Sequence, residues 1–91
     1  MEIKEAIKTA KAYVSHLFTE EGGRDYTLEE VEFKEIERTW RVTVGFARPV
    51  PIDNSLGVRD FTLTLRRAFK VVEIDDTDAQ VLSVRDRERT N

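Results

Sequence analysis

Apolar and polar residues alternate strictly in the stretch from Thr39 to Arg48. Trp40, Val42, Val44 and Phe46 stand at every second position, with polar or small residues between them. This period of two is typical of a strand that buries one face. The pattern therefore predicts a strand over residues 39–48 whose even-numbered side chains, including the Trp40 side chain, lie in the core.

An amphipathic helix is predicted before this strand, over residues 2–18. Its apolar positions follow a spacing of three and then four residues, while lysines and glutamates occupy the other side. The apolar positions are Ile3, Ala6, Ile7, Ala10, Tyr13, Val14 and Leu17. The pair Gly22-Gly23 follows, and glycine supplies the left-handed conformation in which many helices end. We expect the seven apolar side chains to face a sheet.

Three further strands are predicted over residues 28–36, 61–75 and 79–86. Pro49 and Pro51 close the strand 39–48, since proline cannot donate to a sheet ladder, and residues 52–60 form a loop rich in turn formers. The odd-numbered apolar residues of 61–75 are interrupted by Arg67, while Val72 and Ile74 make the other face apolar too. We expect a bulge or bend near Arg67, or a break into two strands.

Together these elements predict one α+β domain over residues 1–91, with a charged tail at 87–91. A single N-terminal helix followed by strands with short connections favours two layers, in which the helix packs across a four-stranded antiparallel meander. Such a sheet leaves its second face open.

Two segments resemble the PepSY-like and wider cystatin-like group of small domains. They are residues 39–46, TWRVTVGF, and residues 69–83, FKVVEIDDTDAQVLS. In that group a helix is followed by an aromatic-rich strand, and then by a strand, an acidic turn and a final strand. The resemblance implies a helix held by a curved antiparallel sheet, with roles in inhibition or protein binding and no catalysis. The glutamine-rich protease-binding loop of cystatins is not visible, so protease inhibition is not implied.

The amino-acid composition limits the classes of partner that we expect for this chain. The 91 residues include 15 basic and 18 acidic side chains, a net charge of −3, which disfavours nucleic acid as the main partner because phosphate binding needs a basic surface. There is no cysteine, so no disulfide framework exists. No apolar run is long enough for a membrane span, and the charged start lacks the apolar stretch of a signal peptide. We therefore expect a cytoplasmic protein without nucleic-acid or membrane partners.

No motif indicates an enzyme. Asp75, Asp76 and Asp78 could offer oxygens to calcium, but the glycine and closing glutamate of an EF-hand loop are missing, and a hairpin turn whose aspartates bind their own backbone is favoured. Ser15 and His16 are adjacent in a helix and so point in different directions. The sequence therefore predicts no catalytic, cofactor-binding or metal-binding residues.

The open sheet face is the predicted site of function. A mixture of arginine and β-branched residues is typical of an interface, although arginine stems can also simply cover an outer sheet face. The candidate interface residues are Arg41, Thr43, Lys70, Val72, Ile74, Val81, Ser83 and Arg85. The expected partner is another protein or a second copy of the chain, bound at this face or at a sheet edge. The alternative is a small-molecule or peptide site in a cleft between the helix and the 52–60 loop.

Overall fold

The computed structural model describes residues 1–51 and 63–87. The helix α1 (Ile3–Phe18) and the short 3-10 turn η1 (Thr19–Glu21) precede four strands. These are β1 (Arg24–Lys34), β2 (Thr39–Pro51), β3 (Leu63–Asp75) and β4 (Val81–Asp86). The predicted 52–60 loop lies outside the described residues, as does most of the predicted tail.

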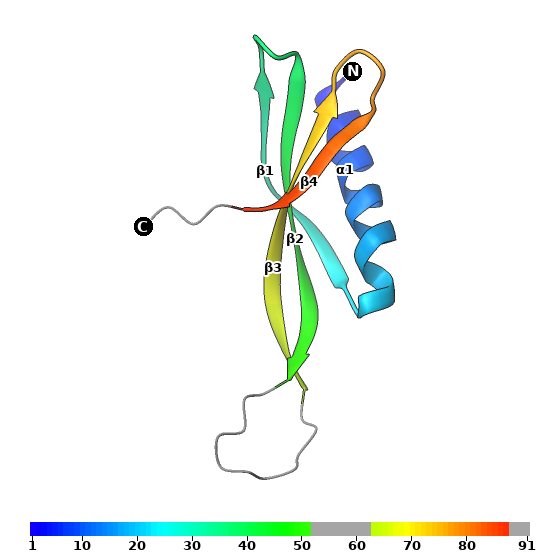
Figure 1. Cartoon of the computed structure of the whole chain (residues 1–91), viewed down its shortest axis with the longest axis vertical. Helices are drawn as coiled ribbons and strands as arrows, with labels where there is room; N and C mark the ends of the chain where they lie inside the picture. Colours follow the sequence, from blue (N-terminus) through cyan, green and yellow to red (C-terminus); the bar gives the residue numbers. More distant parts are fainter. Residues whose placement is uncertain (52–62, 88–91) are drawn as a thin grey trace, which may run out of the picture.

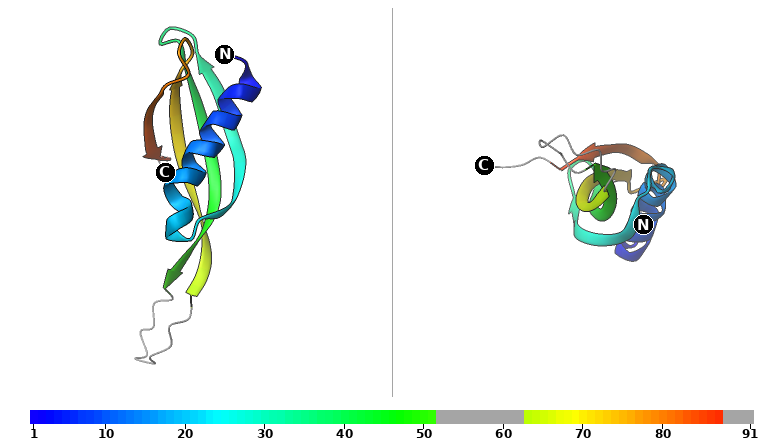
Figure 2. Two further views of the ribbon diagram at one scale, coloured as in Figure 1. Left: turned by 90° about the vertical axis from the view of Figure 1, so that its right-hand side faces the viewer. Right: turned by 90° about the horizontal axis from the view of Figure 1, so that it is seen from below.

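The four strands form one antiparallel sheet in the order β1-β2-β3-β4, so each strand pairs with its neighbour in the chain. Helix α1 runs diagonally across one face of this sheet, and the strands twist strongly about the long axis (Figure 1, Figure 2). The predicted α+β class, with one N-terminal helix on a four-stranded antiparallel meander, is confirmed.

The core lies between α1 and the even-numbered side chains of β2 and β3. Its buried apolar residues are Ala6, Ala10 and Val14 of α1, Val42, Val44 and Phe46 of β2, and Val72 and Ile74 of β3. Phe18 and Tyr26 stack on the Phe46 ring with centroid distances of 5.0 and 5.4 Å, and the half-buried Trp40 packs against the same cluster. The even-numbered face predicted for the central strand is therefore the core face.

Helix α1 buries less than its sequence pattern predicts. Ile3, Tyr13 and Leu17 keep between 41% and 46% of their surface exposed. Ile3 and Leu17 lie at the two ends of the helix. Since only alanines and Val14 form the buried row, the fully buried contact with the sheet is narrow.

The strands also differ from their predicted limits. β1 begins at Arg24 and contains two register shifts against β2, between Arg24 and Thr27 and between Leu28 and Glu30. β3 pairs with β2 without any shift over its whole length. The expected bulge or break near Arg67 is therefore wrong, and the irregularities lie in β1 and between β3 and β4 instead.

The connection from α1 to β1 depends on two glycines. Gly22 has φ of +88°, the left-handed conformation that the sequence predicted, but it ends the turn η1 and not α1 itself. Gly23 is buried, and a Cβ there would lie 2.8 Å from the carbonyl oxygen of Phe18. Its amide donates to that same oxygen at 2.9 Å. The close backbone approach brings β1 under the end of the helix.

Candidate functional site

The eight predicted interface residues divide between the two faces of the sheet. Arg41, Thr43, Ser83 and Arg85 lie on the open face, as predicted, whereas Lys70, Val72, Ile74 and Val81 lie on the face covered by α1. Val72 and Ile74 have no exposed surface. Their predicted place on the open face is therefore wrong.

The register of β2 and β3 explains this correction. Trp40 pairs with Ile74, Val42 with Val72 and Val44 with Lys70. Because directly paired residues point to the same side of a sheet, the even-numbered residues of β3 join the core face of β2. Both faces of this strand are apolar, so alternation alone could not select the buried one.

Ion pairs cover the middle of the open face. The Arg41 guanidinium lies 3.6 Å from the Glu32 carboxylate of β1 and 3.5 Å from the Glu73 carboxylate of β3. These groups, with Glu30, Thr43, Val71, Arg85, Asp86 and Arg87, line a concavity of about 560 Å³. The face is thus a charged surface whose central arginine already has two acidic partners.

A second hollow follows the edge of β3 just beyond the end of β4. It has a volume of about 440 Å³, and we call it the arginine hollow. Its lining residues are Arg48, Val50, Arg66, Arg67, Ala68, Phe69, Asp86 and Arg87. Among the described residues that line it, four carry guanidinium groups and one a carboxylate, so this part of the surface is positive in a chain whose net charge is −3.

The arginine hollow includes residues from both faces of β3. Arg66 and Ala68 belong to the helix-covered side, because Ala68 pairs with Phe46, whereas Arg67 and Phe69 belong to the open side. The Phe69 ring has the Arg87 guanidinium 4.0 Å from its centroid and the Arg67 guanidinium at 5.9 Å. Such cation–π contacts hold both arginines at this edge.

Lys70 and Asp86 form the boundary between this hollow and the core. The Lys70 ammonium donates a hydrogen bond to the Asp86 carboxylate and lies 5.1 Å from the centroid of the Phe18 ring. That hydrogen bond, with a smaller effect of Arg48, lowers the pKa of Asp86. The one acid among the described lining residues of the arginine hollow is therefore already bound by a lysine.

The acidic turn between β3 and β4 is held by its own hydrogen bonds. Asp75 accepts from the amides of Thr77 and Asp78, and Asp78 accepts from the amide of Gln80. These are the backbone contacts expected of a hairpin turn. In the part of the chain that the structure describes, no group of three or more histidine, cysteine or acidic side chains is arranged to hold a metal ion.

Asp76 is directed away from this turn, into a cluster at the end of the sheet. It accepts hydrogen bonds from Trp40 Nε1 at 2.9 Å, from Arg38 at 2.9 Å and from the Met1 ammonium at 3.2 Å. The Trp40 bond is the largest cause of a lowered Asp76 pKa. The cluster connects the helix start, β2 and the β3–β4 turn, so the role of Asp76 is to hold these elements together.

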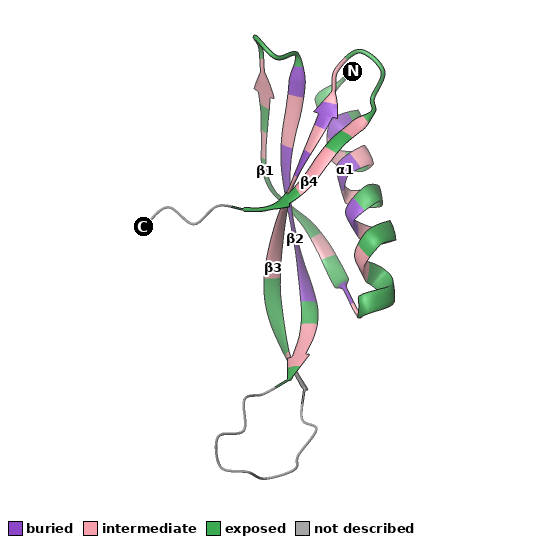
Figure 3. Cartoon of the chain, in the orientation of Figure 1, coloured by how far each residue is buried: buried purple, intermediate pink, exposed green. Residues whose placement is uncertain are grey.

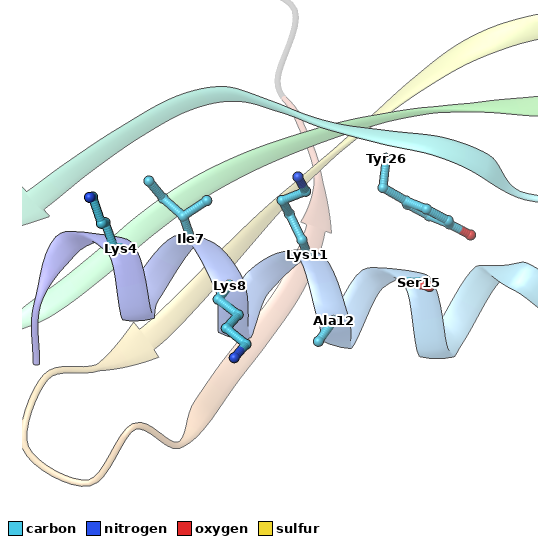
Figure 4. A pocket seen from close by; sticks show the side chains of 7 residues that line it. All are labelled: Lys4, Ile7, Lys8, Lys11, Ala12, Ser15 and Tyr26. Atoms are coloured by element: carbon cyan, nitrogen blue, oxygen red, sulfur yellow. The ribbon is translucent and has the colours of Figure 1, made fainter.

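A groove of about 500 Å³ lies between α1 and β1. Six of its lining residues come from the helix and one from the strand: Lys4, Ile7, Lys8, Lys11, Ala12, Ser15 and Tyr26 (Figure 4). The cleft predicted between the helix and the 52–60 loop cannot be compared with this groove, since that loop lies outside the described residues.

Ser15 contacts Thr19 and His16 is exposed at the end of the helix.

No known protein family, curated protein or solved structure matches this chain. The resemblance to PepSY-like and cystatin-like domains therefore stays a prediction. Within residues 1–51 and 63–87, no helix is long and apolar enough to cross a membrane.

Proposed function

We propose that this chain is a non-enzymatic protein-binding domain that uses the arginine hollow and the neighbouring edge of β3. One observation carries the proposal. β4 pairs with β3 only from Lys70 to Ile74, so among the described strands none pairs with the other edge of β3 between Leu63 and Ala68. Exposed positions follow β3 below its crossing with β4 (Figure 3). A strand edge lined with arginines is a ready-made binding surface.

The charges favour this edge over the centre of the open face. Arg41 is already paired with Glu32 and Glu73, and the cores of interfaces are depleted in charged residues. Arg66 and Arg87, in contrast, form no ion pair with any described residue. Arginine is enriched where proteins bind one another and dominates many of the energetically important positions.

Charge reversal at the arginine hollow tests the proposal. Immobilised wild-type chain, Arg66→Glu and a matched control, Arg24→Glu, would be compared for proteins captured from the source cell. Arg24 is also an exposed arginine, at the start of β1 on the far side of β2. We expect wild type and control to capture the same protein, and Arg66→Glu to lose it with an unchanged far-UV circular dichroism spectrum.

Light scattering on a sizing column separates the two kinds of partner. A dimer that Arg66→Glu converts to a monomer identifies the partner as a second copy of the chain. Equal capture by all three proteins, together with equal oligomeric states, would contradict the proposed surface.

The groove between α1 and β1 supports a second candidate function, the binding of an anionic small molecule or peptide. Lys4, Lys8 and Lys11 supply three positive charges beside the apolar Ile7 and the Tyr26 ring. Small-ligand sites combine an apolar lining with few polar groups in this way. A thermal-shift screen of anionic metabolites, repeated on Lys8→Glu, tests it. A stabilising compound must lose its effect in that variant.

A further inference from the structure

The edge of β3 that pairs with no described strand has a defined hydrogen-bonding direction. The amide of Arg87 donates to the carbonyl oxygen of Phe69 at 3.2 Å, so the backbone groups of Phe69 point toward the position of β4. In an antiparallel sheet the residues that point to one neighbour alternate along the strand. The N–H and C=O groups of Arg67 and Leu65 therefore point to the same side, where β4 has already ended.

The arginine hollow borders the part of β3 that lies beyond the end of β4. It is lined by Arg66, Arg67, Ala68 and Phe69 of β3, by Arg48 and Val50 of β2, and by Asp86 and Arg87 at the end of β4. The guanidinium groups that line it are therefore within reach of a strand added at this edge. The edge from Leu63 to Ala68 is about 20 Å long at roughly 3.3 Å per residue, the length of a typical short strand.

The outer edge of β1 is poorly suited to the same use. It carries Glu29, Glu30 and Glu32 and two register shifts. Bulges disfavour strand addition at exposed edges, and the glutamates would repel an acidic segment, whereas arginines would attract one. The edge of β3 beside the arginines belongs to a strand that pairs with β2 without a register shift, so of these two edges it suits an added acidic strand better.

From these observations, and resting on the proposed protein-binding function, we infer that β3 accepts an extended acidic segment of a partner protein as an additional strand. The segment continues the position of β4 and pairs its backbone with Leu65 and Arg67. Its carboxylates meet Arg66 on one face of the sheet and Arg87 on the other. Backbone pairing supplies affinity, while charge-assisted contacts from the guanidinium groups select acidic side chains.

Two peptides of identical charge test strand addition. One is an eight-residue, end-blocked peptide with the sequence Glu-Glu-Val-Val repeated twice, which places carboxylates on both faces of a strand, and the other has the same sequence with every backbone nitrogen methylated. Titration into ¹⁵N-labelled full-length chain gives the affinity and the amide shifts. We expect the first peptide to bind with a Kd below about 1 mM and to slow hydrogen exchange at the Leu65 and Arg67 amides. The methylated peptide must bind at least about tenfold more weakly, because it cannot donate hydrogen bonds to the edge.

Variants locate the acidic contacts. Arg66→Glu and Arg87→Glu should each raise the Kd of the unmethylated peptide by about tenfold or more, and Arg24→Glu should leave this Kd unchanged. Equal binding of the two peptides would overturn strand addition while leaving the proposed protein-binding surface intact. Failure of the unmethylated peptide to bind would overturn the inference too. The capture experiment with Arg66→Glu would then decide the proposed function independently.

Oligothymidylate of matched charge is the remaining probe. If it binds the arginine hollow more tightly than the peptide, with the same loss in Arg66→Glu, the surface recognises nucleic acid and the inference is wrong. We expect weaker binding of the oligonucleotide, because it has no backbone groups that match a strand edge and the chain as a whole is acidic.

Discussion

The Glu29 carboxylate and the Arg67 guanidinium meet 3.1 Å apart on the open face, directly above Gly45. A Cβ at residue 45 would lie 2.5 Å from Glu29 Oε1 and 2.6 Å from Arg67 Nη2. The glycine thus provides the space in which an ion pair can bridge β1 and β3 across the central strand. Arg67 also donates to Thr27 Oγ1 at 2.7 Å, which orients it at the rim of the arginine hollow.

Gly45→Ala should separate this ion pair without unfolding the domain. The two colliding groups are the ends of flexible side chains, and a partly exposed ion pair contributes about 0.2–1 kcal/mol. Alanine regains about 0.5–1 kcal/mol over glycine within a strand. We expect the free energy of unfolding in urea to change by less than about 1 kcal/mol. In the Gly45→Ala variant, adding Glu29→Gln should not change the free energy of unfolding further. A remaining coupling energy between Glu29 and Arg67 in that variant would contradict this account.

Val71 and Val72 are neighbours in sequence on opposite faces of β3. Val72 is fully buried against α1, while Val71 is half-buried on the open face. Val72→Ala should lower the free energy of unfolding by about 2 kcal/mol, since it deletes buried methyl groups and leaves a cavity. Val71→Ala is the matched control, with an expected loss below about 1 kcal/mol. Equal losses in chemical denaturation would show that the register of β3 is different.

Because Gly23 lies close to the end of the helix, substitution of Gly23 should destabilise the fold more than substitution of Gly45. The missing Cβ of Gly23 would meet the backbone carbonyl of Phe18, which cannot move aside as a side-chain end can. Gly23→Ala should therefore cost about 1–3 kcal/mol of stability. Thermal or urea unfolding measures this loss. The exposed Glu21→Ala serves as the neighbouring control and should change stability little.

Acid should weaken the cluster around Asp76. Hydrogen bonds from Trp40 and the Met1 ammonium, with the charge of Arg38, hold its pKa below the ordinary value of 3.8. The folded pKa is lower than the unfolded one, so the ionised carboxylate stabilises the fold fully above that ordinary value. This contribution is lost as the pH falls through the folded pKa.

Unfolding free energies measured between pH 5 and pH 2 should therefore fall more steeply in the wild type than in Asp76→Asn. Trp40 is the only tryptophan, so its fluorescence reports directly on the hydrogen bond to Asp76. Identical pH profiles for the two proteins would exclude a contribution of this carboxylate.

The sequence predicted a strand and its buried face correctly where only one face of the strand was apolar. Alternation of Trp40, Val42, Val44 and Phe46 identified both the central strand and its buried face. Either face of β3 could have been the buried one, because Phe69 and Val71 form one apolar row and Val72 and Ile74 form another. Only the pairing with β2 selects the second row, and no local propensity determines that pairing across a long connection.

The arginine hollow was not predicted, although part of its signal was present. The predicted strand 61–75 was nearly twice as long as its partner 79–86, so an unpaired length of edge followed from the predicted boundaries. The adjacent Arg66 and Arg67 fall within that length. The contact of Phe69 with Arg87 could not be foreseen, because it depends on which face of β3 is buried.

The unlike edges of the sheet also determine how far any assembly can grow. β1 presents glutamates and irregular backbone, whereas β3 presents arginines and a regular edge that stops where β4 begins. A strand received at β3 leaves β1 unable to receive another in the same manner. Of these two edges, the geometry therefore favours one acidic partner segment for each chain, received at β3 and not at β1.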